Sequence, residues 1–217
     1  MVTAEIITEP LVLEQFRQRY AALARASIDM EYLCRNTVRG FFSDSGELLG
    51  GYVYCASTPF RYVSAVPFSV AELLGEDRVD DVCECTCIWM ERSLSSTERI
   101  GIYAWAYRDF SATGKRHVLG GSFNEKVMRI QRHGLPELVF AGQATVEGKT
   151  VRAWVYVGTR WTCVRALLIR SPVRLWLGLM RWAQSSVHAV SSKSCTPATA
   201  TTSSSGESET MARSARK

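Results

Sequence analysis

Residues 82–90, VCECTCIWM, decide how the rest of the sequence is interpreted. The stretch alternates along its length and contains Val, Cys, Thr, Ile and Trp, so it predicts a β-strand. The following segment, SSTERIGIYAWAYRDFSATG (95–114), begins with a Ser/Thr–Glu capping signal and ends at Gly114, which predicts a helix of about four turns. HVLGGSF (117–123) predicts a second strand. A strand, a helix and a strand in succession are typical of a sheet with helices packed on it.

The remaining segments extend this alternation of helices and strands. Further predicted elements are a helix over 11–25, a hairpin over 36–56, an irregular link over 59–67, a short helix over 69–76, a helix over 125–134 capped by Asn124, and strands over 137–146 and 149–157. The order predicts a mixed sheet with helices packed on it.

The composition of the 217 residues, 47% hydrophobic and 22% charged, is normal for a globular domain. The net charge of +5 is uneven: residues 159–217 carry nine Lys and Arg and two Glu, whereas residues 1–158 carry 17 basic and 19 acidic side chains. The slight acidic excess of the larger part argues against nucleic-acid binding. Residues 1–10 lack a basic region followed by an apolar run, so no signal peptide is predicted and a cytoplasmic protein is expected.

The C-terminal part divides into a basic, tryptophan-rich segment (159–184) and a Ser/Thr-rich tail (185–217) that predicts disorder. Arginines interrupt the first segment too often for a membrane-spanning helix. Ser171-Pro172 predicts a helix over 172–184. This helix either packs on the sheet or forms a surface that contacts anionic lipid or an acidic carrier protein.

The cysteines of the predicted strand 82–90 invite a metal-site interpretation, which strand geometry disfavours. Side chains alternate faces, so Cys83, Cys85 and Cys87 should share one face, and Glu84 and Thr86 the other. Thiols spaced about 6.5–7 Å apart along a straight strand cannot converge on one zinc ion. The seven cysteines of the chain are odd in number and scattered, which argues against a disulfide framework. We expect buried apolar thiols, and a Glu84 that is either a surface residue or a general base.

Four stretches together resemble the GNAT acyltransferase fold, and more narrowly the acyl-homoserine-lactone (autoinducer) synthases and the related N-acyl amino acid synthases. GFFSDSGELLGGYVYCASTPFRYV (40–63) is similar to the family's hairpin, whose second strand leads to a loop with a basic residue. VSAVPFSVAELLGEDRVDDVCECTCIWM (63–90) is similar to a short helical insert followed by a strand of pattern Glu-x-Ser-Arg-apolar. HVLGGSFNEKVMRIQRHGLP (117–136) and AGQATVEGKTVRAWVYV (141–157) are similar to the strand, helix and closing hairpin that follow.

The resemblance covers roughly residues 12–158 and implies an α/β (α+β) fold with a mixed, mainly antiparallel sheet flanked by helices. The resemblance implies that residues 1–158 form a GNAT-like acyltransferase domain. Glu84 matches the family's strand carboxylate and would take the proton of an attacking amine, with Thr86 positioning the substrate. Arg61 would hold the carboxylate of an amino-acid-like acceptor, or else it is a solvated loop arginine.

Other residues carry further expectations. Cys87 stands in the substrate region where the family has an arginine. Gly120, Gly121 and Ser122 would lie against a pantetheine arm, unless the paired glycines form a simple β-bulge. The strands 82–90 and 117–123 would line a gap whose backbone N–H groups stabilise an oxyanion. His117 and His133 have no partner at catalytic spacing and are expected to be structural, and no metal site is predicted.

The implied function is transfer of a fatty acyl group from acyl-carrier protein, or acyl-CoA, to an amino-acid-like amine, as in autoinducer synthesis for quorum sensing or N-acyl amino acid synthesis. S-adenosylmethionine is one such acceptor, and no resident cofactor is expected. ERSLSSTERIG (91–101) has only one glycine and therefore no Gly-rich phosphate loop, which favours a carrier protein as donor. The alternative is a diverged, non-catalytic GNAT-fold protein or membrane-binding module, favoured by Cys87 and by the lack of a Trp and an acidic pair near the N-terminus.

Overall fold

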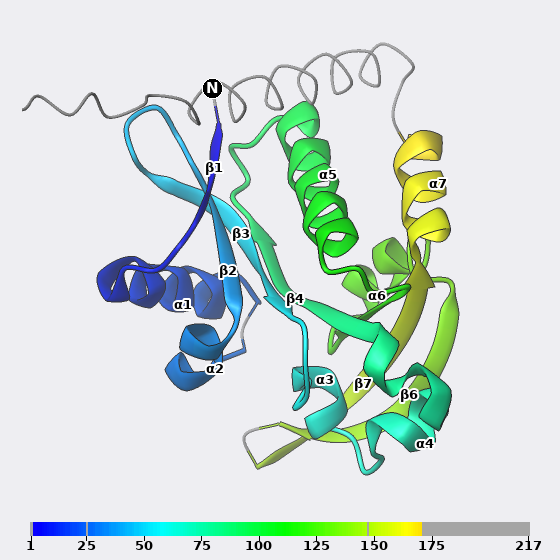
Figure 1. Cartoon of the computed structure of the whole chain (residues 1–217). Helices are drawn as coiled ribbons and strands as arrows, with labels where there is room; N and C mark the ends of the chain where they lie inside the picture. The colour runs from blue at the N-terminus through cyan, green and yellow to red at the C-terminus, as the bar shows by residue number, and fades with distance from the viewer. Residues whose placement is uncertain (1, 25, 147, 171–217) are drawn as a thin grey trace, which may run out of the picture. The chain divides into compact units, whose positions relative to one another are not determined.

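The computed structural model describes residues 2–24, 26–146 and 148–170 (Figure 1). The strands are β1 (Thr3–Ile6), β2 (Thr37–Phe42), β3 (Leu48–Cys55), β4 (Val82–Met90), β5 (His117–Ser122), β6 (Glu137–Val146) and β7 (Lys149–Thr159). The helices are α1 (Pro10–Ala24), α2 (Met30–Arg35), α3 (Arg61–Ser64), α4 (Val70–Leu74), a 3₁₀ turn (Glu76–Asp81), α5 (Ser96–Ala112), α6 (Glu125–Gln131) and α7 (Arg160–Arg170).

The strands form one sheet in the order β1-β2-β3-β4-β5-β7-β6. Neighbouring strands are antiparallel except for β4 and β5, which are parallel. The predicted α/β class, with a mixed, mainly antiparallel sheet flanked by helices, is therefore confirmed. The central strand β4 is the one on which the sequence interpretation rests.

Helices cover both faces of the sheet around β4 (Figure 1). Helices α1 and α2 bury Phe16 and Leu33 against one face, in a core that also contains Trp89 of β4. Helix α5 buries Ile102 and Phe110 against the opposite face, and α7 packs beside α5. The two faces of β4 therefore meet different helices and different cores.

Local sequence signals explain why the main helices form where they do. Helix α5 starts with a capping box in which the Ser95 side chain accepts from Glu98 N and the Glu98 carboxylate accepts from Ser95 N. The Asn124 side chain caps α6, as predicted. Gly46 adopts a φ of 79° in the β2–β3 turn, a conformation that glycine takes without a steric penalty.

The predicted short helix over 69–76 is present as α4, but three other short elements were not predicted. Strand β1 and helix α2 lie in stretches without a clear period, and α3 is one helical turn inside the predicted irregular link. Helix α7 directly follows β7, whereas the predicted helix over 172–184 and the predicted disordered tail lie outside the described residues. The domain boundaries therefore stay a prediction. Within the described ranges, no helix has the length and apolar character needed to cross a bilayer.

A buried ion pair ties β2 to α5. The Arg39 guanidinium donates from Nε to Asp109 Oδ2 at 2.6 Å and from Nη2 to Asp109 Oδ1 at 2.9 Å. Tyr52 Oη donates to the same carboxylate at 2.7 Å, and the Trp105 ring centroid lies 4.8 Å from the guanidinium carbon. Such bidentate geometry fixes both side chains and fastens the helix to the sheet.

Candidate active site

Strand β4 contains a bulge at Cys87. Its register against β3 shifts between Gly51 and Val53, and Cys87 has a φ of 53°, unusual for a residue with a side chain. The extra residue places Thr86 and Cys87 on the same face of the sheet, with Thr86 Oγ1 3.6 Å from Cys87 Sγ. The prediction that the three cysteines share a face is therefore wrong for Cys87, because a bulge shifts the alternation by one residue.

The hydrogen-bond ladder between β4 and β5 ends early. The two strands pair only over Val82–Glu84 and His117–Leu119. Beyond these residues, β4 continues along β3 to Met90 and β5 continues along β7 to Ser122. Among the described strands, none pairs with this side of β4 beyond Glu84. The backbone N–H groups there are candidates for the oxyanion-stabilising role expected from the sequence.

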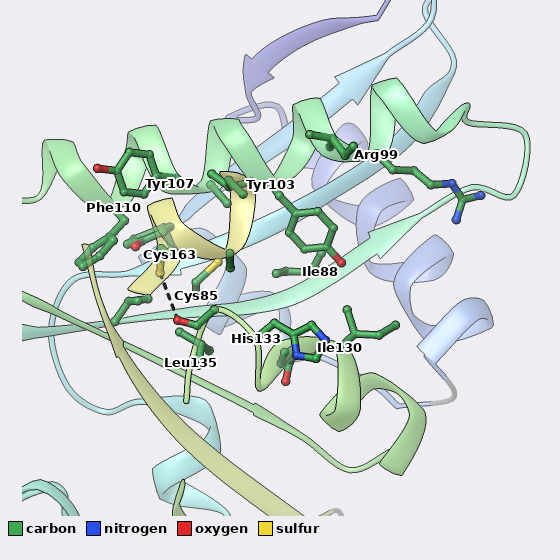
Figure 2. Close-up of a pocket in the computed structure, with 18 residues that line it drawn as sticks. Cys85, Ile88, Arg99, Tyr103, Tyr107, Phe110, Ile130, His133, Leu135 and Cys163 are labelled. Atoms are coloured by element: carbon green, nitrogen blue, oxygen red, sulfur yellow. Dashed lines mark hydrogen bonds between the residues drawn. The ribbon is translucent and has the colours of Figure 1, made fainter. Parts of the chain in front are cut away.

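An apolar pocket of about 220 Å³ lies on the α5 face of β4 (Figure 2). Cys85 and Ile88 line it from β4, and Cys163 lines it from α7. In Figure 2, the labelled residues of α5 lie on one side of the pocket, and Ile130, His133 and Leu135 lie on the other. The lining also includes Tyr54, Tyr103, Tyr107, Phe110, Val118 and Ala166. Such an apolar lining suits an alkyl chain.

The thiols in the apolar pocket are poor nucleophiles. Burial raises the pKa of Cys163 to about 12 and raises the pKa of Cys85 well above its ordinary value. Both groups keep their proton at neutral pH, and the thiolate is the reactive form. The described residues contain no group of three His, Cys, Asp or Glu side chains arranged to hold a metal ion.

Glu84 lies on the other face of β4 and is fully buried. Its Oε1 accepts from Tyr62 N at 2.8 Å, and its Oε2 accepts from Arg61 N at 2.7 Å and from Tyr32 Oη at 2.9 Å. The expectation that Glu84 could be a surface residue is therefore wrong. Burial raises the pKa of Glu84, although these three donors act in the opposite direction. A raised pKa makes a carboxylate a stronger base.

Arg61 is the first residue of α3, and its backbone N–H donates to this carboxylate. The alternative expectation, a solvated loop arginine, is wrong. Its guanidinium donates to Tyr20 Oη at 3.2 Å and to Ser27 O at 3.0 Å. The rings of Tyr20, Tyr62 and Phe123 lie within 6 Å of its central carbon. None of the ion pairs seen in the described part of the chain involves Arg61. A guanidinium whose contacts are neutral is suited to bind an anion.

A second, open pocket of about 720 Å³ is lined in part by this arginine. We call it the cationic pocket, because Arg17, Arg35 and Arg61 line it. Tyr32 of α2 also lines it, beside Asp29 and Glu31. The apolar and cationic pockets therefore lie on opposite faces of β4, one reached from Cys85 and the other from the Glu84 side.

Thr86 and Cys87 are both buried on the side of β4 that faces the cationic pocket. The Thr86 hydroxyl interacts with the Tyr62 hydroxyl. The Cys87 thiol interacts with Tyr20 and lies close enough to Arg61 to feel its charge. The structure thus brings four sequence-predicted residues together: Arg61, Glu84, Thr86 and Cys87.

The paired glycines of β5 do not form a bulge, because β5 stays in register with β7 from His117 to Ser122. Instead, side chains of the protein approach them closely. A Cβ on Gly120 would lie 2.6 Å from Leu135 Cδ1, and one on Gly121 would lie 2.5 Å from Tyr62 Cγ. Ser122 Oγ exchanges hydrogen bonds of 2.9 Å with the backbone of Asn124 and shapes the turn into α6.

We expect Gly121→Ala to lower the free energy of unfolding by about 1–3 kcal/mol, because the added methyl would overlap the Tyr62 ring and approach Trp154 O at 2.9 Å. Gly101→Ala in α5 is the matched control: its Cβ would meet nothing within 4 Å, and alanine favours a helix by up to about 1 kcal/mol. Urea denaturation followed by circular dichroism measures both. Equal stability of the two variants would contradict the prediction.

The candidate-site residues that sequence reasoning missed come mainly from short or distant elements. Tyr20 of α1 contacts Arg61, and Tyr32 of α2 contacts Glu84. Neither tyrosine belongs to a recognisable sequence motif. His133, expected to be structural, is exposed and lines the apolar pocket. A buried carboxylate such as Glu84 needs nearby donors, which is the one general signal that could have prompted a search for tyrosines.

Comparison with solved structures identifies the fold. FeeM, an N-acyl amino acid synthase from uncultured soil microbes, matches with a TM-score of 0.61 and 13% identity over 77% of this chain and 96% of that chain. NAA60 from Arabidopsis thaliana, solved with a bisubstrate analogue, matches with a TM-score of 0.54 and 12% identity over 73% and 99%. No family model and no curated protein matches the sequence. The chain has the GNAT acyltransferase fold and resembles the N-acyl amino acid synthase, as predicted.

Proposed function

We propose that the protein is an N-acyltransferase that moves a fatty acyl group from a thioester donor to an amino-acid-like amine, as in the synthesis of N-acyl amino acids or autoinducers. The observation that carries the proposal is the position of β4 between two unlike pockets. The apolar pocket suits an acyl chain, and the cationic pocket suits the carboxylate of an acceptor. Glu84 lies on the acceptor side and can serve as the base.

In this proposal, Arg61 binds the acceptor carboxylate and Glu84 receives the proton of its ammonium group. The neutral amine attacks the thioester carbonyl, and backbone N–H groups of β4 beyond Glu84 stabilise the oxyanion. Thr86 and Cys87, at the bulge, position the acceptor beside Arg61. The carbon–nitrogen bond forms as the carbon–sulfur bond breaks, and the thiol leaves.

The donor in this proposal is an acyl-carrier protein rather than acyl-CoA. A helix N-terminus can bind phosphate, but at α5 the Glu98 carboxylate takes this position and accepts from Ser95 N at 2.8 Å. Hydrogen bonds from Ser95 lower the pKa of Glu98, so a negative charge occupies the site where the diphosphate of CoA would be expected. Gly120, Gly121 and Ser122 stay predicted neighbours of the pantetheine arm.

The proposal is tested by incubating the purified protein with acyl-carrier protein or acyl-CoA and with amino acids or S-adenosylmethionine, followed by mass spectrometry. We expect an N-acyl product, formed faster from the carrier protein and lost in Glu84→Gln. Glu125→Gln, an exposed carboxylate on α6, is the matched control. The same comparison can be made on lipid extracts of expressing cells. If no N-acyl product depends on Glu84, the enzymatic proposal is wrong.

The exposed face of α7 supports a second candidate role, peripheral membrane binding. Trp161 and Ile169 are 69% and 72% exposed, and Leu168 and Arg165 are exposed on the same side of the helix. Exposed apolar side chains beside an arginine are typical of a helix that lies on a membrane containing anionic lipid. Co-sedimentation with vesicles containing phosphatidylglycerol should fall for Trp161→Ala combined with Ile169→Ser, but not for Leu11→Ser, which is exposed on α1. Binding unaffected by the α7 changes would exclude this role.

A further inference from the structure

Tyr32 connects the cationic pocket to the buried carboxylate. Its side chain lines that pocket, and its hydroxyl donates to Glu84 Oε2 at 2.9 Å. The tyrosine is half-buried, whereas Glu84 is fully buried. The guanidinium carbon of Arg35 lies 5.7 Å from the centroid of the Tyr32 ring. Among the three donors to Glu84, Tyr32 is the one that donates through its side chain, and it also lines the cationic pocket.

Glu84 needs such an intermediary. It lines neither the apolar pocket nor the cationic pocket. Two of its three hydrogen bonds come from the backbone N–H groups of Arg61 and Tyr62, which cannot transfer a proton at neutral pH. An amine bound in the cationic pocket would meet Tyr32 before it could meet the carboxylate.

We infer that Tyr32 is a catalytic residue that passes the proton of the acceptor ammonium group to Glu84. This inference rests on the proposed acyl transfer. The phenol oxygen accepts the ammonium proton as the phenol proton moves to Glu84 Oε2, so Tyr32 is neutral before and after the step. The amine lone pair then forms the carbon–nitrogen bond, the carbon–sulfur bond breaks, and the second nitrogen proton goes to the departing thiolate.

The surroundings suit this transfer. Burial, followed by the charge of Glu84, raises the pKa of Tyr32, so the phenol keeps its proton and acts only by exchange. The charged and titratable groups that line the pocket or interact with Tyr32 and Glu84 are Arg17, Asp29, Glu31, Arg35, Cys55, Arg61, Tyr62 and Cys87. Arginines beside a bound ammonium favour its neutral form.

Tyr32→Phe tests the inference in the same product assay. We expect kcat to fall by about 100-fold with little change in the KM of the amine, because the base loses contact with its substrate. The loss should be greatest at low pH and should shrink as pH rises, since the amine then arrives already deprotonated. The pH profile distinguishes proton transfer from a purely structural role.

Two matched Tyr→Phe variants complete the experiment. Tyr52→Phe removes the same kind of tyrosine–carboxylate bond, to Asp109 at 2.7 Å, outside both pockets, and should leave kcat and the pH profile unchanged. Tyr20→Phe removes a contact of Arg61 and should raise the KM of the amine without changing the pH profile.

The outcomes separate the two proposals. A wild-type protein that forms no N-acyl product overturns the proposed function and the role of Tyr32 with it. An active wild type with an unchanged Tyr32→Phe overturns the role of Tyr32 alone. A loss in Tyr32→Phe that is equal at every pH, accompanied by lower stability, also overturns it and assigns the hydroxyl to folding.

Discussion

Asp109→Ala is expected to lower the free energy of unfolding by about 3–5 kcal/mol, because it leaves the Arg39 guanidinium inside the protein without its carboxylate. The two side chains are only 10% and 15% exposed, so water cannot replace the lost partner well. The variant also removes the acceptor of the Tyr52 hydroxyl. Urea denaturation followed by tryptophan fluorescence measures the change.

Two controls show whether the cost comes from the stranded charge. Arg39→Met combined with Asp109→Leu removes both charges and should recover most of the lost stability, since apolar residues of similar volume often replace a buried pair at little cost. Glu125→Ala breaks the exposed pair with Arg129, where water takes over, and should change nothing measurable. If Asp109→Ala behaves like Glu125→Ala, the pair does not fasten α5 to the sheet.

Glu84→Ala is expected to lower the free energy of unfolding by about 2–5 kcal/mol, because it leaves the buried N–H groups of Arg61 and Tyr62 without an acceptor. Glu84→Gln keeps the shape and one acceptor oxygen, so it should cost less. Both variants should lower acyl transfer by at least about 100-fold, the usual contribution of a general base. Stability and activity measured on both variants separate these effects.

The pH dependence of stability tests the environment of Glu84 independently of catalysis. Because its pKa in the folded protein is raised above the ordinary value of 4.5, the folded state binds this proton more tightly than the unfolded state. Its contribution to stability is therefore full below pH 4.5 and is lost as pH rises through the raised pKa. Glu84→Gln lacks this titration, so wild type should lose stability relative to it as pH rises. A constant difference from pH 4 to 8 would contradict a raised pKa.

Long periodic segments explain why much of the fold was predictable. Helix α5 has a capping box and a glycine stop, and β6 and β7 flank a turn with Gly148 at a φ of 73°. Strand β1 and helix α2 are too short for a period to appear, and their positions depend on pairing with β2 and packing against α1. Tertiary contacts, rather than local propensity, therefore decide these elements.

The candidate site was only partly predictable for the same reason. Glu84 and Arg61 were named from the family resemblance, and the structure brings them together through a backbone hydrogen bond of 2.7 Å. The bulge at Cys87 was not anticipated, because nothing in the sequence marks a cysteine for a positive φ. Tyr32 reaches Glu84 across 52 positions of sequence, a distance at which spacing carries no information.

The bulge at Cys87 also decides which side chains face which core beyond it. Without the bulge, the same nine residues of β4 would alternate regularly, so Ile88 and Met90 would turn toward α1 and α2 while Trp89 would turn toward α5. A change that straightens β4 without removing a residue would thus exchange the two linings beyond Cys87, whereas deleting Cys87 itself would remove the extra residue and keep them. In the β2–β3 turn, a Cβ on Gly46 would meet nothing within 4 Å, so this turn should accept a deletion or an insertion. Length should therefore vary more freely at that hairpin than in the regular stretches of β4, where one residue removed or added turns every later side chain to the opposite face.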